Sequence, residues 1–164
     1  MTAEAPAAAR FRFLYRQGEG AIDAGQWRRA VWPPVAVAVA LTLVWLAVMP
    51  RQARDLAHEN LIDWGVAATY AYLMVYVFAL FLCAIAEYFV SAKRFSDRGM
   101  PPGLAGLAPF ALFLAGAANW YQPHSEGLMP PWANFPFDAA ALAAVAWTIV
   151  ELGFGPGRAA GDEP

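Results

Sequence analysis

Charged side chains are scarce in this sequence. Only 15% of its 164 residues are charged, whereas 60% are hydrophobic and the mean hydropathy is +0.40. Soluble domains are about 25% charged and about 45–50% apolar, so the composition favours a membrane protein. The 11 basic residues form no large cluster, so no nucleic-acid partner is expected.

Cysteine and histidine are also nearly absent. The single cysteine, Cys83, excludes an internal disulfide and a thiolate metal cluster, and its apolar surroundings predict a small buried hydrophobe. His58 and His124 could ligate a metal or haem with Glu59 or Glu126. Neither histidine has a second donor at ligand spacing, so we favour solvated loop histidines and expect no metal or cofactor.

Four long apolar stretches predict an all-α, integral membrane four-helix bundle, because about 20 apolar residues cross a bilayer. The predicted spans form a membrane domain over residues 31–154: 31–49, 64–90, 103–121 and 138–154. Pro33 and Pro34 are placed in the first turn of the first span, and Pro109 is expected to kink the third. Asp138 is the expected N-cap of the fourth span.

Residues 1–30 form a predicted cytoplasmic tail and interfacial arm, in which arginines alternate with aromatic rings. An ordinary flank to the membrane is the favoured interpretation, and specific lipid recognition is the alternative. The residues expected to contact lipid or a partner are Arg10, Arg12, Arg16, Trp27, Arg28, Arg29 and Trp32.

The distribution of lysine and arginine predicts the orientation. With four spans, residues 155–164 form a second tail on the same side as the arm, and that side carries nine basic residues against two on the other. The positive-inside rule then predicts that both termini are cytoplasmic.

Small residues at helical spacing indicate how the spans pack, since helices in lipid associate by close backbone approach. The sequence offers the pairs Ala139–Ala143 and Ala140–Ala144, and Gly103 and Gly106 near Leu107. An aromatic series on the second span could contact a pigment or quinone but is more simply explained by packing: Tyr70, Tyr72, Tyr76, Phe78 and Phe81.

Glu87 is the ionisable group placed most clearly inside a span. Because it lies about one turn from the predicted cytoplasmic end, a snorkelling or salt-bridged anchor is favoured over a proton or ion carrier. Glu151, near the end of the fourth span, receives the same interpretation. If the helix continues past Val90, then Glu87, Ser91, Arg94 and Arg98 lie on one stripe.

Residues 91–102 form a predicted basic turn between the second and third spans. Asp97 stands among Lys93, Arg94 and Arg98, so an ion pair could clamp the two spans. Gly99 suits a left-handed turn, and Pro101 and Pro102 prevent further helix.

The heptapeptide KRFSDRG at 93–99 resembles the R-R-L-H-D-x-G loop of the domain of unknown function 805 family, small bacterial inner-membrane proteins. Lys93, Arg94, Asp97 and Gly99 match by type, whereas Ser96 stands where that family has histidine. The segment GAIDAGQW at 20–27 is similar to the family's G-R-I-x-R-x-x-F-W segment, without its arginines. The resemblance implies four helices in a bacterial inner membrane and no established chemistry.

These features predict a non-enzymatic accessory or scaffold subunit of the bacterial inner membrane. Its expected partners are membrane lipids and other membrane-protein subunits or copies of itself. A small oligomeric transporter or channel is the alternative, and a membrane enzyme ranks third. The sequence has no nucleophile paired with a base, no phosphate-binding glycine loop and no HExxH.

Overall fold

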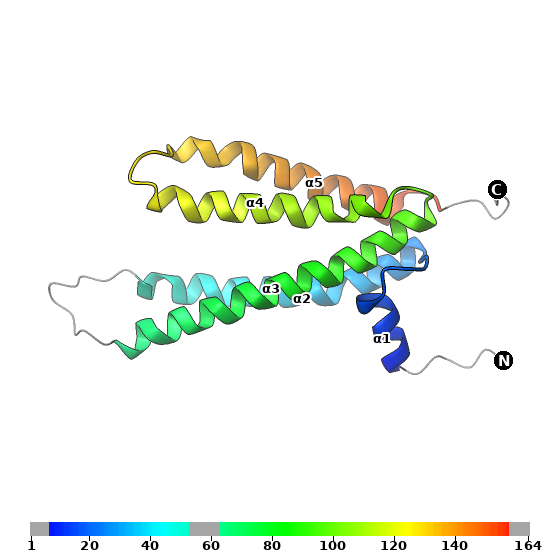
Figure 1. Ribbon diagram of the computed structural model, residues 1–164, viewed down its shortest axis with the longest axis horizontal. Helices are drawn as coiled ribbons and strands as arrows, with labels where there is room; N and C mark the ends of the chain where they lie inside the picture. The colour runs from blue at the N-terminus through cyan, green and yellow to red at the C-terminus, as the bar shows by residue number, and fades with distance from the viewer. Residues whose placement is uncertain (1–6, 53–62, 158–164) are drawn as a thin grey trace. The chain divides into compact units, whose positions relative to one another are not determined.

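The computed structural model describes residues 7–52 and 63–157, and within these ranges every regular element is helical (Figure 1). The α-helices are α1 (Ala7–Arg16), α2 (Ala24–Val48), α3 (Trp64–Asp97), α4 (Leu107–Tyr121) and α5 (Phe135–Phe154). Short 3₁₀ helices are η1 (Met49–Gln52), η2 (Pro102–Gly106), η3 (Gln122–His124) and η4 (Pro131–Asn134).

Four helical stretches are long and apolar enough to cross a membrane, as the sequence predicts. They are Ala24–Val48, Trp64–Asp97, Pro102–His124 and Pro131–Phe154. The all-helical class and the four apolar helices are therefore confirmed, and the chain has the make-up of a multi-pass membrane protein. The bounds of the helices differ from the predicted ones in three informative places.

The first difference is that α2 begins at Ala24 and not at Val31. Asp23 caps it: its carboxylate accepts a hydrogen bond of 2.8 Å from the amide of Gln26. Pro33 and Pro34 therefore lie inside the helix and not in its first turn. Because Pro34 has no N–H, the carbonyl of Ala30 lacks its usual helical donor, and the Tyr15 hydroxyl donates to it instead at 2.8 Å.

The second and third differences concern α4 and α5. Since α4 begins at Leu107, Pro109 lies in its first turn, where no intrahelical hydrogen bond is lost and no kink is expected. The expectation that Asp138 is a helix N-cap is wrong, because α5 begins at Phe135 after Asn134. Asp138 instead accepts a hydrogen bond of 2.8 Å from the Asn119 amide, which joins α4 to α5.

The chain divides into two compact units, one formed by residues 1–31 and 86–164 and the other by 32–85. In the second unit, two contacts made by hydroxyl groups join α2 to α3. Tyr72 donates to the Leu41 carbonyl at 2.7 Å, and the hydroxyls of Tyr76 and Thr42 lie 3.1 Å apart. Tyr70, Phe78 and Phe81 are exposed, so the aromatic series consists of interhelical contacts and outward-facing rings, as the packing interpretation expects.

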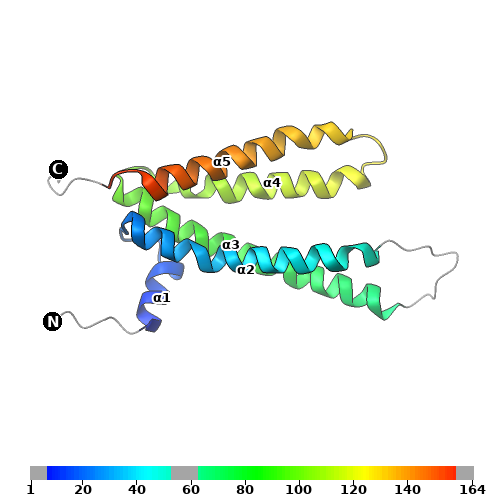
Figure 2. The same ribbon diagram turned by 180° about the vertical axis from the view of Figure 1, so that it is seen from behind.

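In the first unit, α4 and α5 lie side by side (Figures 1 and 2). Their buried residues are mostly alanine, which lets the two backbones approach closely. These are Ala108, Ala115 and Ala118 on α4 and Ala141, Ala144 and Thr148 on α5. Of the predicted small-residue pairs on α5, only Ala144 is buried, whereas Ala139, Ala140 and Ala143 are exposed.

Large apolar side chains are exposed along each of the long helices. Examples are Leu43 on α2, Phe81 on α3, Phe113 on α4 and Leu142 on α5, all more than half exposed. In a membrane protein, exposed apolar side chains of this number contact the hydrocarbon tails of the lipids.

Candidate functional site

The C-terminal end of α3 is the part of the described chain where buried polar residues gather. The predicted basic turn at 91–102 is not a turn in its first half, because α3 continues to Asp97. No glycine or proline interrupts residues 91–97, and Ser91, Lys93 and Arg94 are 1%, 0% and 2% exposed. These residues are therefore buried parts of a helix and not of a turn.

The helix ends in a hydrogen-bonded motif centred on Gly99. Gly99 has φ of 71°, the left-handed conformation that its position predicts. The amide of Met100 donates to the Phe95 carbonyl at 2.9 Å, and the amide of Gly99 donates to the Ser96 carbonyl at 3.0 Å. This pair of bonds is the Schellman pattern, which satisfies the last carbonyls of a helix.

Lys93 caps the C-terminus of α1. Its ammonium donates hydrogen bonds to the carbonyls of Leu14 at 3.2 Å, of Gln17, and of Phe89 in its own helix at 3.1 Å. The rings of Phe13 and Phe89 lie 5.3 and 5.8 Å from the same nitrogen. Since α1 ends at Arg16, the first two carbonyls belong to its unsatisfied last turn, where the helix dipole favours a positive charge.

Arg94 caps the C-terminus of α5 in the same way. Its guanidinium donates to the carbonyls of Leu152 at 3.1 Å and Gly155 at 2.6 Å, and it forms an ion pair with Asp97. The helix ends at Phe154, so both carbonyls lie at the negative end of its dipole. A buried guanidinium with three partners satisfies the requirement that a buried charge be compensated.

Two further arginines contact the same last turn of α5. Arg98 pairs with the Glu151 carboxylate at 2.7 Å and also donates to the Glu151 carbonyl. Arg28, from the start of α2, donates to the Gly153 carbonyl at 3.4 Å and lies over the Phe154 ring at 6.0 Å. Glu151 is thus a salt-bridged residue, one of the two forms of anchor that its position predicts.

The sequence predicted that Trp27 contacts lipid or a partner. This prediction is wrong, because Trp27 is buried. It is 4% exposed, and its indole N–H donates to the Ser91 hydroxyl at 3.2 Å. The ring packs so closely on Gly153 that a Cβ there would lie 3.4 Å from it. An aromatic residue next to arginines resembles an interfacial residue in sequence, and only the contact with Ser91 distinguishes the two cases.

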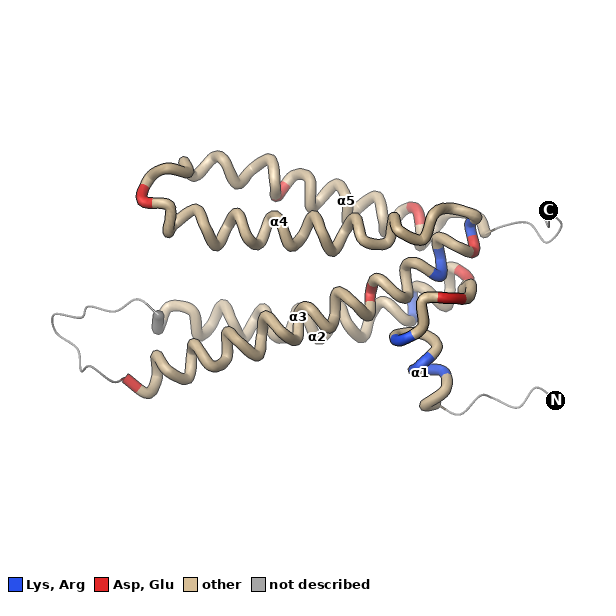
Figure 3. The backbone as a smooth tube through the Cα atoms, in the orientation of Figure 1, with Lys and Arg blue, Asp and Glu red and all other residues tan. Residues whose placement is uncertain are grey.

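The other arm residues lie at the surface. Arg10, Arg12, Arg16, Arg29 and Trp32 are exposed, and Arg10 and Arg29 line a common cavity. Together with Lys93, Arg94 and Arg98, the basic residues of the first unit gather on α1, the start of α2 and the end of α3 (Figure 3).

Glu87 is half-buried, and no side chain in residues 7–52 or 63–157 forms a hydrogen bond or ion pair with its carboxylate. Glu87, Ser91 and Arg94 lie on α3, whereas Arg98 follows its end, and the guanidiniums of Arg94 and Arg98 both bond to the end of α5. Glu87 is therefore not anchored by either arginine.

The histidines supply no ligand cluster in the described chain. His58 and Glu59 lie outside the described residues. His124 stacks on Trp120 with ring centroids 5.0 Å apart, and its Nδ1 lies 2.7 Å from the Trp120 carbonyl. Within the described residues, no three His, Cys, Asp or Glu side chains lie close enough together to hold a metal ion.

Comparison of the chain with protein-family models, with curated proteins and with solved structures finds no match. The resemblance at 93–99 therefore stays a prediction that rests on its own residues. The site itself, which we call the basic cap cluster, consists of Lys93, Arg94, Asp97, Arg98, Arg28 and Glu151 with the helix ends that they contact.

Proposed function

We propose that this chain is a non-enzymatic protein of the bacterial inner membrane, an accessory or scaffold subunit that contacts lipids and other membrane-protein subunits or copies of itself. The observation that carries the proposal is that the buried charged side chains bond to the ends of other helices. Lys93 and Arg94 each cap the end of another helix, so they serve to hold α1 and α5 against α3. Capped helix ends together with exposed apolar side chains on the long helices suit a protein that packs against neighbouring membrane helices.

The exposed apolar surface supports contact with lipid and with other helices. The rings of Phe78, Phe81 and Phe113 face outward on α3 and α4 and are each more than 60% exposed. We also propose that the resemblance at 93–99 reflects membership of the domain of unknown function 805 family. In that case, Lys93, Arg94, Asp97 and Gly99 are shared because they cap α1 and α5 and form the end of α3.

A small oligomeric transporter is the second candidate, and the observation in its favour is Glu87. A half-buried carboxylate inside an apolar helix, with no ion-pair partner among the described residues, is the usual starting point for a proton or ion path. The two functions predict opposite results for the same substitution.

We expect Glu87→Gln to leave the set of co-purifying membrane proteins unchanged in a mild-detergent pull-down. Proton or ion flux in vesicles containing only the purified chain should equal that of empty vesicles, for the wild type and for the variant. Glu151→Gln is the matched control, because that carboxylate is paired with Arg98. Flux above background in the wild type that disappears in Glu87→Gln would establish the transporter in place of the scaffold.

We further propose that the N- and C-terminal ends of the chain are cytoplasmic, because the basic residues of the first unit gather at one end of its helices (Figure 3). In a Cys83→Ser background, Leu128→Cys should react with an impermeant thiol reagent added to intact cells, since this side chain is 83% exposed between α4 and α5. Glu19→Cys, between α1 and α2, should react only after the cells are opened. The reverse pattern would invert the proposed orientation.

A further inference from the structure

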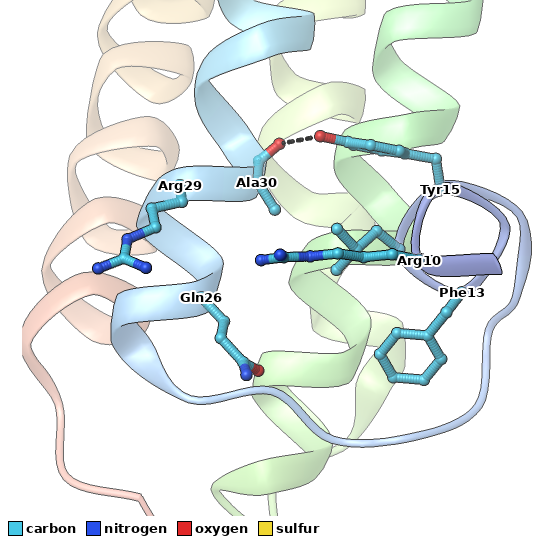
Figure 4. A pocket seen from close by; sticks show the side chains of 7 residues that line it. Arg10, Phe13, Tyr15, Gln26, Arg29 and Ala30 are labelled. Carbon is cyan, nitrogen blue, oxygen red and sulfur yellow. Dashed lines mark hydrogen bonds between the residues drawn. The ribbon is translucent and has the colours of Figure 1, made fainter. Parts of the chain in front are cut away.

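A cavity of about 350 Å³ lies between α1 and the first turns of α2, within the first unit (Figure 4). Arg10 extends from α1 toward α2, and Gln26 and Arg29 project from adjacent turns of α2. The residues that line the cavity are Arg10, Phe13, Leu14, Tyr15, Gln26, Arg29 and Ala30.

The polar part of this lining is positively charged. Two guanidiniums from different helices line one space, and no carboxylate in the described ranges forms an ion pair with either. Asp23, the acidic residue nearest in sequence to Gln26, is occupied as the cap of α2. Burial raises the pKa of the Tyr15 hydroxyl, and the positive charge of Arg10 opposes this rise only in part.

The remaining lining is apolar and held in place. Phe13 and Leu14 belong to the turn of α1 that Lys93 caps, since Lys93 bonds to the Leu14 carbonyl and lies over the Phe13 ring. The hydrogen bond from Tyr15 to the Ala30 carbonyl ties the two helices together beside the cavity. Two guanidiniums thus stand beside an apolar surface in a space built by α1 and α2.

We propose that this cavity binds the phosphate group of an anionic phospholipid, with Arg10 and Arg29 as its hydrogen-bond donors. Guanidinium groups bind phosphate oxygens through paired hydrogen bonds, and Gln26 supplies a further amide donor. The apolar lining favours a lipid over a free phosphate, because it contacts the glycerol and acyl carbons next to the headgroup. Phe11, more than half exposed on α1, packs on the Tyr15 ring with the ring centroids 5.1 Å apart, so it adds apolar surface next to the lining. The inference deepens the proposed function and rests on its membrane placement.

The test compares two double variants with the same loss of charge. R10Q/R29Q removes the two guanidiniums of the cavity, whereas R12Q/R16Q removes two exposed arginines of α1 that do not line it. Delipidated full-length protein in mild detergent is titrated with phosphatidylglycerol, and bound lipid is counted by native mass spectrometry. We expect R10Q/R29Q to weaken binding by about tenfold or more, since each basic residue beside an anionic headgroup contributes substantially, and R12Q/R16Q by about twofold or less.

Three outcomes would contradict the proposal that the cavity binds an anionic phospholipid. Equal weakening in both double variants would indicate diffuse attraction to an arginine-rich arm. Equal wild-type affinity for phosphatidylcholine and phosphatidylglycerol would exclude recognition of net anionic charge. Saturation by inorganic phosphate or glycerol 3-phosphate, at concentrations that displace the lipid, would identify a soluble phosphate compound as the ligand.

The same variants separate this site from the proposed scaffold function. If R10Q/R29Q binds phosphatidylglycerol like the wild type and still co-purifies with the same proteins, the proposed lipid site is wrong and the scaffold function is supported. If the wild type binds lipid at this site but co-purifies with no other protein and forms no oligomer, the scaffold function is wrong and the lipid site is supported. All four substituted arginines are exposed, so neither double variant is expected to unfold, and a thermal melt of each variant checks this.

Discussion

Replacing Arg94 with leucine is expected to lower the free energy of unfolding by about 3 kcal/mol or more, since removal of one partner leaves buried groups uncompensated. The guanidinium is 2% exposed and bonds to Leu152, Gly155 and Asp97. Without it, the carbonyls at the end of α5 lose their donors and Asp97 loses its counter-charge. In a chain of this length the melting temperature should fall by roughly 10 °C in mild detergent.

The substitution Arg12→Leu is the control for this prediction, because Arg12 is an exposed arginine on α1. It should change the stability by no more than about 0.5 kcal/mol. Asp97→Asn removes only one of the three contacts of Arg94, at a side chain that is 26% exposed, so a loss of about 1–2 kcal/mol is expected. If Arg94→Leu melts like Arg12→Leu, then the cap does not stabilise the fold.

Replacing Lys93 with methionine is expected to release α1 from the end of α3. The substitution leaves the carbonyls of Leu14 and Gln17 without their charged donor. A hydrogen bond to a charged group contributes about 1.5–3 kcal/mol, and a helix of ten residues is not stable alone. Amide hydrogen exchange in α1 should therefore accelerate about a hundredfold, the equivalent of about 2.8 kcal/mol.

Amide hydrogen exchange in residues 64–85 of α3 provides an internal control for Lys93→Met. These residues belong to the second unit and should keep their protection if only the arm is released. Arg16→Met, at an exposed basic residue of α1, should leave exchange in both regions unchanged. Equal acceleration in α1 and in residues 64–85 would mean that Lys93 supports the whole fold and not the docking of the arm.

Composition and hydropathy were sufficient to predict the class of this protein. A run such as 64–90 has too few charges and too many apolar residues to be anything but a buried or membrane helix, whatever it packs against. The left-handed conformation of Gly99 was also predicted correctly, because a glycine followed by prolines at 101 and 102 acts through the local backbone. Such properties depend on a residue and its immediate neighbours in the chain.

The sequence misplaced features that depend on contacts between distant residues. Lys93 and Arg94 were assigned to a turn in which Asp97 would pair with a basic residue. Nothing local shows that helix ends near Gln17 and Gly155 will reach them. A usable signal was present, because Val90, Ala92 and Phe95 surround these cations on an uninterrupted helix, and all three are buried. Trp27 was placed among the membrane contacts for the same reason, since its bond to Ser91 joins residues that lie far apart in the chain.

The sequence by itself therefore determined that this is an all-helical chain with four apolar helices, because length and hydropathy are additive along the chain. The tertiary structure alone decided the roles of the charged residues. A basic side chain has the same formal charge in a loop, against lipid or over a helix C-terminus. Which role it takes depends on the unsatisfied carbonyls brought within its reach, and at Lys93 and Arg94 those carbonyls belong to α1 and α5.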